Sequence, residues 1–135
     1  MLKTIKLTAA TENYSTLFKW LNEIFELWNL STNLANKINI CSEEIFINIA
    51  SYAYKETQGN IEISINKNND EIMLTFEDEG VEYNPLQKED PDITLSLDER
   101  PIGGLGIFMV KQMSKNVEYE YRDNKNILKL TFGIE

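Results

Sequence analysis

The spacing of hydrophobic residues along the chain changes between the period of a strand and the period of a helix. Residues 2–9, LKTIKLTA, alternate apolar with polar side chains, which predicts a first strand. Residues 12–28 then predict a helix, because six large apolar side chains recur at helical spacing: Leu17, Trp20, Leu21, Ile24, Phe25 and Trp28. We expect Trp20 and Trp28, which share one face, to pack in the core, with a protein interface as the alternative.

The same reading predicts two more helices and four more strands. A helix over residues 33–55 has Ser31 or Thr32 as a candidate N-cap. The later segments are, in order, a hairpin over 61–76, a loop over 80–101 that holds all three prolines, a helix over 104–115, and strands over 116–123 and 126–134. A loop of this length is uncommon in a compact domain and is usually functional.

This order of elements predicts the fold class. Strands and helices that follow one another mostly as hairpins and helix-linked neighbours indicate an α+β fold. We expect a two-layer α/β sandwich, with a mixed, mostly antiparallel sheet and the helices on one face. The 135 residues are enough for one domain with its own core, so residues 1–135 are expected to form a single domain.

Composition narrows the chemistry. The net charge of −9 argues against nucleic acid or an anionic membrane as a direct partner. The chain has no histidine, which excludes histidine acid–base chemistry and histidine metal sites. We also find no apolar stretch long enough for a transmembrane helix and no signal-peptide core. The single cysteine, Cys41, is expected to be a buried apolar residue and suits a reducing cytoplasm, where we expect the protein to act.

Two polar residues interrupt the apolar face of the second predicted helix. At 100° per residue, Glu44 lies on the rim of that face and Asn48 lies inside it, whereas Glu43 points to solvent. Glu44 and Asn48 are four residues apart, so their side chains are neighbours. Asn48 could be a structural amide bonded to a loop. Alternatively, the carboxylate and the amide oxygen face one cleft, where they suit Mg²⁺ and a general base.

The hairpin ends in a second candidate site. Asp78 continues the alternating face of its strand and is therefore expected to point inward, where a carboxylate needs a hydrogen-bond donor. Gly80 follows two residues later. Asp followed closely by Gly is also a common turn signal, so a purely structural turn is the alternative.

Three glycines stand directly before the third predicted helix, at Gly103, Gly104 and Gly106. A helix N-terminus exposes unpaired N–H groups, and glycines let a phosphate approach that backbone closely. The stretch lacks the lysine of a P-loop and does not follow a strand, which argues against the Walker A and dinucleotide-binding motifs. A flexible loop that meets a helix is the alternative.

In this order, these motifs resemble the histidine-kinase-like ATPase superfamily. EEIFINIASYAY is similar to the N-box helix of its anti-sigma-factor serine-protein kinase branch, DEGVEYNPL to the first glycine box, and ERPIGGLGIFMVKQM to the second. VEYEYRDNKNILKLTF resembles the closing hairpin. The similarity covers nearly the whole chain and implies the Bergerat ATP-binding fold, with ATP and Mg²⁺ as cofactors.

The resemblance implies roles for the nucleotide-binding residues. Asn48 would supply an oxygen to Mg²⁺, Asp78 would accept a hydrogen bond from the adenine amino group, and Gly80 would let the backbone pass under the base. The second glycine box would bind phosphate: Gly103 opens it, and Gly104, Leu105 and Gly106 would give backbone N–H groups. Residues 80–102 would form a lid over the nucleotide, from which Arg100 would contact phosphate.

The resemblance also implies a reaction and partners. Glu44 would act as the catalytic base toward a protein serine, in an ATP-dependent kinase that phosphorylates a small antagonist protein. Its protein partners would be a sigma factor, that anti-sigma-factor antagonist, or both, so that transcription is regulated by partner switching. Since relatives dimerise, a homodimer is among the expected assemblies.

Three departures from the family pattern bear on catalysis. Tyr52 stands where many relatives have histidine, and Glu82 stands where glycine or proline is usual. Ile127 falls near a threonine that faces adenine in some relatives. We expect Glu82 to point outward. The departures at Tyr52 and Glu82 favour the alternative function, an ATP-binding regulatory interaction module without phosphotransfer, whereas Glu44 favours the kinase.

Overall fold

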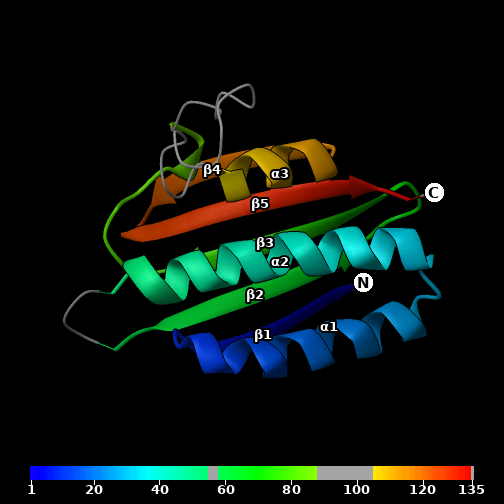
Figure 1. Cartoon of the computed structure of the whole chain (residues 1–135), viewed down its shortest axis with the longest axis horizontal. Helices are drawn as coiled ribbons and strands as arrows, with labels where there is room; N and C mark the ends of the chain where they lie inside the picture. Colours follow the sequence, from blue (N-terminus) through cyan, green and yellow to red (C-terminus); the bar gives the residue numbers. More distant parts are fainter. Residues whose placement is uncertain (55–57, 88–104, 135) are drawn as a thin grey trace.

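The computed structural model describes residues 1–54, 58–87 and 105–134 and shows a two-layer arrangement (Figure 1). A five-stranded sheet forms one layer, and the three α-helices cover one of its faces. The elements are β1 (Leu2–Thr8), η1 (Thr11–Asn13), α1 (Tyr14–Leu27), α2 (Thr32–Tyr52), β2 (Asn60–Lys67), β3 (Glu71–Asp78), η2 (Pro85–Gln87), α3 (Leu105–Met113), β4 (Asn116–Arg122) and β5 (Lys125–Gly133). The predicted α+β sandwich is confirmed.

The sheet has the strand order β1-β2-β3-β5-β4. All four described pairings are antiparallel, so the prediction of a mixed, mostly antiparallel sheet is narrowed to antiparallel pairing in this part of the chain. The last hairpin folds back so that β5, and not β4, pairs with β3. This order places the ends of β3 and β5 side by side, with Asp78 opposite Asn126.

Alternation along each strand decides which residues enter the core. The inward positions of β2, β3 and β5 are fully or almost fully buried and are apolar except at one end of β3 and β5. They pack against the apolar stripes of the helices in one cluster, which contains Cys41 and is flanked by the half-buried Trp20 and Trp28. Core packing of the two tryptophans is therefore confirmed, as is burial of Cys41, which raises the pKa of its thiol to about 12.

Local sequence signals set the helix ends and the tight turn. Ser31 is the N-cap of α2, because its Oγ accepts a hydrogen bond of 3.1 Å from the backbone N–H of Leu34. The helix ends at Tyr52, earlier than the predicted residue 55. Asp123 and Asn124 both have positive φ, of 54° and 62°, as a two-residue type I′ hairpin requires. Among the described helices, none is long and apolar enough to cross a membrane.

Candidate functional site

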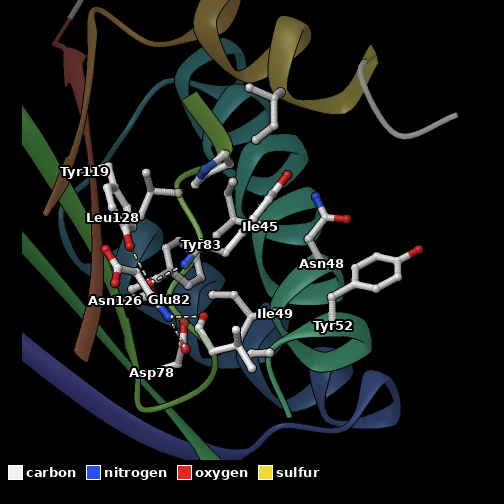
Figure 2. A pocket seen from close by; sticks show the side chains of 15 residues that line it. Ile45, Asn48, Ile49, Tyr52, Asp78, Glu82, Tyr83, Tyr119, Asn126 and Leu128 are labelled. Carbon is white, nitrogen blue, oxygen red and sulfur yellow. Dashed lines mark hydrogen bonds between the residues drawn. The ribbon is translucent and has the colours of Figure 1, made fainter. Parts of the chain in front are cut away.

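A cavity of about 530 Å³ opens between the C-terminal half of α2 and the neighbouring ends of β3, β4 and β5 (Figure 2). Its apolar lining consists of Ile45, Ile49, Ala53, Phe76, Val81, Pro85, Ile107 and Leu128, and its polar or aromatic lining consists of Asn48, Tyr52, Asp78, Glu82, Tyr83, Tyr119 and Asn126. A mostly apolar cleft with a few polar groups is the usual form of a small-molecule site. None of the described lining residues is basic.

Asp78 lies at the inner end of this cavity and is only 6% exposed. Its Oδ1 accepts hydrogen bonds from the backbone N–H of Gly80, at 2.9 Å, and from Nδ2 of Asn126, at 3.0 Å. The predicted inward orientation is confirmed by this burial. The turn predicted from Asp78 and Gly80 is also present. Asp78 is therefore both a turn residue and an inward-pointing carboxylate. In the described part of the chain, Oδ2 has no such partner and remains available to a ligand.

Burial and hydrogen bonding act on the Asp78 carboxyl in opposite directions. Desolvation raises its pKa, while the bonds from Asn126 and Gly80 lower it, and the raising effect is the larger. Tyr119, beside it on β4, also has a raised pKa, mainly because of desolvation. The carboxylate is thus held in an apolar setting by a small number of donors.

The sequence analysis missed Asn126, which connects four parts of this site. Besides bonding Asp78, its Nδ2 donates to the carbonyl of Val81 at 2.9 Å. Its Oδ1 accepts from the backbone N–H of Tyr83, at 3.0 Å, and from the hydroxyl of Tyr119. The alternation of β5 could have identified it, since Asn126 shares the inward face with Leu128.

Glu44 and Asn48 lie one turn apart on α2, as predicted. Nδ2 of Asn48 donates to Oε1 of Glu44 at 3.1 Å. Among the described residues, this leaves Oδ1 of Asn48 able to face a cation and Oε2 of Glu44 able to accept a proton. Asn48 lines the same cavity as Asp78 (Figure 2). The structure therefore brings Asn48 and Asp78 together in one cleft, and the hydrogen bond from Asn48 holds Glu44 beside it.

Gly106, the second residue of α3, allows Glu44 to approach the start of that helix. A Cβ at Gly106 would lie 1.7 Å from Oε1 of Glu44 and 2.1 Å from its Cδ. A second, smaller cavity of about 240 Å³ opens here between α2 and α3, lined by Ile40, Glu43, Glu44, Gly106, Met109 and Val110. Glu44 is therefore reachable from the groove between the helices, and Glu43 is exposed as predicted.

Gly80 is required for contact between the loop after β3 and the end of α2. A Cβ there would lie 2.4 Å from the carbonyl oxygen of Ala53 and 2.7 Å from its carbonyl carbon. The next residue, Val81, donates its backbone N–H to the same Ala53 oxygen at 3.0 Å. This close packing holds the wall of the cavity that carries Val81 and Tyr83.

The three residues that depart from the family pattern, Tyr52, Glu82 and Ile127, lie in different places relative to the cavity. Tyr52 is 70% exposed at the mouth of the cavity. Glu82 is exposed, which agrees with the expected outward orientation, and it is also one of the residues that line the cavity. Ile127 pairs with Glu77 on the outer face of the sheet and does not line the cavity; Asn126 and Leu128 face it instead.

The remaining predicted residues belong to the second glycine box. Leu105 and Gly106 begin α3, as predicted for a glycine-rich helix start. Arg100, Gly103 and Gly104 lie outside the described residues, as does most of the predicted lid over 80–102.

The oxygen atoms of the described side chains suit a magnesium ion that is bound together with a nucleotide better than a metal ion that is bound by protein alone. In the part of the chain that the structure describes, no group of three or more acidic or cysteine residues could hold a metal ion. Mg²⁺ in nucleotide enzymes needs only one or two protein oxygens, because phosphates and waters complete its octahedron. Oδ1 of Asn48, which has no hydrogen-bond partner among the described residues, is one such oxygen.

Comparison with known proteins agrees with this geometry. The family described as the histidine kinase-like ATPase domain matches residues 7–132. The chain is also 28% identical over 131 residues to the serine/threonine-protein kinase BtrW of Bordetella bronchiseptica, and the alignment covers 95% of this chain and 91% of the relative.

Proposed function

Because the chain belongs to the histidine kinase-like ATPase domain family, we propose that it is an ATP-dependent serine-protein kinase of the anti-sigma-factor type. Residues 1–135 would act as one domain. The observation that carries this proposal is the cavity lined by both Asp78 and Asn48, together with the hydrogen bond that ties Asn48 to Glu44 in the neighbouring groove between α2 and α3. The similarity to a serine/threonine-protein kinase over nearly the whole chain supports the choice of reaction.

Adenine would occupy the buried part of the cavity. Its flat apolar faces suit the walls formed by Ile49, Phe76 and Leu128, and its amino group would donate to Oδ2 of Asp78. Gly80 would keep the loop under the base in place through its contact with Ala53.

The phosphates would extend toward α2 and the start of α3. Bound Mg²⁺ would neutralise phosphate charge, and Oδ1 of Asn48 would be its protein ligand. Leu105 and Gly106 would offer backbone N–H groups at the positive end of α3, joined by Gly103 and Gly104, and Arg100 would add a positive charge.

Glu44 would act as the base in the transfer itself. A serine hydroxyl that enters from the groove between α2 and α3 would lose its proton to Oε2 of Glu44. Its oxygen would bond to the γ-phosphorus while the bond to the β-phosphate oxygen breaks, and ADP would leave with that electron pair. The hydrogen bond from Asn48 to Oε1 would keep the carboxylate turned toward the acceptor.

The expected partners follow from the family branch. We propose that the protein acts in the cytoplasm, phosphorylates a small antagonist protein, and binds a sigma factor, as a homodimer. The net charge of −9 is consistent with partners other than nucleic acid.

A second candidate is an ATP-binding regulatory module without phosphotransfer. The identity of residue 82 favours it, because Glu82 brings a negative charge to the wall of the proposed nucleotide cavity, at a position where the family usually has glycine or proline. Binding of ATP without transfer to any protein would support this alternative.

Isothermal titration with ATP, with and without Mg²⁺, tests the proposal directly. We expect binding that requires Mg²⁺, and a loss of about tenfold or more in affinity for Asn48→Ala, because its oxygen would complete the metal site. Asn33→Ala, at the other end of the same helix, is a matched control that should bind normally. No binding of millimolar ATP to the wild-type protein would contradict both candidate functions.

A further inference from the structure

The orientation of the Asn126 side chain is determined by partners that can form hydrogen bonds in only one sense. The backbone N–H of Tyr83 can only donate, so the atom that it contacts, at 3.0 Å, must be the amide oxygen. The carbonyl of Val81 can only accept, so the atom 2.9 Å from it must be the amide nitrogen. Asn126 therefore presents an N–H to Asp78. The two backbone partners fix which atom of the amide is nitrogen and which is oxygen.

The geometry around Asp78 then distinguishes its two oxygens. Oδ1 already accepts from Asn126 and from the N–H of Gly80. Oδ2 is the oxygen that the described residues leave to a ligand in the cavity. Since Asn126 is 7% exposed and Asp78 is 6% exposed, solvent contributes little to holding either side chain in place.

We propose that Asn126 is a positioning residue that sets nucleobase selectivity, by keeping Asp78 ionised and presenting Oδ2 alone to the base. This inference rests on the proposed function. An ionised Oδ2 accepts a hydrogen bond from a 6-aminopurine such as adenine. It repels a 6-oxopurine, whose carbonyl oxygen is also an acceptor. A protonated Asp78 would instead donate to that carbonyl, so the preference for adenine would weaken.

The surroundings of Asp78 disfavour its ionised form, so the hydrogen bond from Asn126 is needed to stabilise the carboxylate. Burial disfavours the charged carboxylate, and the hydrogen bonds from Asn126 and Gly80 are the effects that lower its pKa. The other titratable groups nearby are Tyr54, which follows the C-cap of α2, Tyr119 of β4, and the loop carboxylates of Glu79 and Glu82. Both tyrosines have raised pKa values and so stay neutral at pH 7, which leaves Asp78 without a described positive partner.

Affinities for Mg-ATP and Mg-ITP, measured by titration calorimetry, test the proposal. We expect the wild-type protein to prefer ATP, and Asn126→Ala to lower the ATP-to-ITP preference by about tenfold, because a hydrogen bond to a charged group is lost. Asn116→Ala, which removes an exposed asparagine at the start of neighbouring β4, should keep the wild-type preference. Parallel weakening of both nucleotides in Asn126→Ala would overturn the proposal and leave Asn126 a structural role only.

A second measurement needs no variant, in case Asn126→Ala fails to fold. The ATP-to-ITP preference of the wild-type protein should fall as the pH is lowered from 7.5 to 4, because burial raises the pKa of the Asp78 carboxyl above its ordinary value, so that Asp78 takes up a proton in the lower part of this range. Protonation of the triphosphate is common to both nucleotides and cancels in the ratio. A constant preference over this range would overturn the inference alone, whereas no ATP binding would overturn the proposed function and the inference with it.

Discussion

At the residue scale, the site depends on how polar side chains are oriented by one another. Within the described part of the chain, the hydrogen bond between Asn48 and Glu44 leaves one oxygen of each residue unbonded, and these two oxygens suit different tasks. An amide oxygen is a neutral ligand for a hard cation, and a carboxylate oxygen can accept a proton. In the proposed function, pairing on one helical turn would therefore separate cation binding by Asn48 from proton transfer by Glu44.

This division predicts a distinct result for Glu44→Gln. The glutamine retains an oxygen for Asn48, so ATP affinity should stay within about threefold of the wild type, whereas phosphotransfer should fall by about 10²–10⁴-fold because the base is lost. The measurements are calorimetric ATP binding and transfer of labelled phosphate to a purified substrate protein. Glu43→Gln is the matched control and should keep the wild-type rate of phosphotransfer. A larger loss of phosphotransfer in Glu43→Gln than in Glu44→Gln would contradict the assignment of Glu44 as the base.

At the element scale, the cavity exists because a loop packs on the end of a helix. The loop after β3 approaches the carbonyl of Ala53 so closely that no side chain fits at Gly80. The same loop is tied to β5 through Asn126, which bonds both Val81 and Tyr83. The wall of the cavity is thus held between α2 on one side and β5 on the other.

Gly80→Ala should disturb this contact measurably. Its Cβ would meet backbone atoms of Ala53, which cannot rotate away, so we expect a loss of about 1–3 kcal/mol in the free energy of unfolding. ATP binding should weaken as well, because the loop that carries Val81 must shift. Urea denaturation measures the first effect and calorimetry the second. Gly133→Ala is the control, since a Cβ there meets nothing within 4 Å, and equal losses for both variants would contradict the packing argument.

At the scale of the whole molecule, stability and the proposed binding of adenine make opposite demands on the charge of Asp78. The fold raises the pKa of this carboxyl above its value in the unfolded chain, so the folded state binds its proton more tightly. The ionised group therefore lowers the stability of the ligand-free protein. This effect is absent below the unfolded pKa and develops as the pH rises through the folded pKa.

Asp78→Asn should consequently stabilise the ligand-free protein at pH 7 while it weakens ATP binding. The asparagine keeps an oxygen for Asn126 and Gly80 but carries no charge to desolvate. Thermal unfolding at pH 7 should give a higher Tm than the wild type, and the difference should shrink toward pH 4. A variant that is less stable than the wild type at pH 7 would show that the charged form is favoured by the fold. An equal loss of affinity for ATP and ITP would indicate a structural role instead.

Much of the fold and part of the site could be predicted because their causes are local. Hydrophobic period separates helices from strands, and a spacing of four residues makes Glu44 and Asn48 neighbours on any α-helix. Alternation along one strand turns Asp78 inward. The end of α2 at Tyr52 was harder to predict from the sequence, because the apolar pattern continues beyond this residue.

The sequence by itself therefore determined the elements, their inward faces and the residue types that chemistry needs. Only the tertiary structure decided which of those residues meet. Asn126 reaches Asp78 because β5 pairs with β3, and Glu44 reaches Gly106 because α3 packs beside α2. Neither contact follows from local periodicity, since Asn126 and Asp78 are 48 residues apart. Which strands become neighbours depends on the packing of the whole sheet against its helices, a property that no single segment of the chain contains.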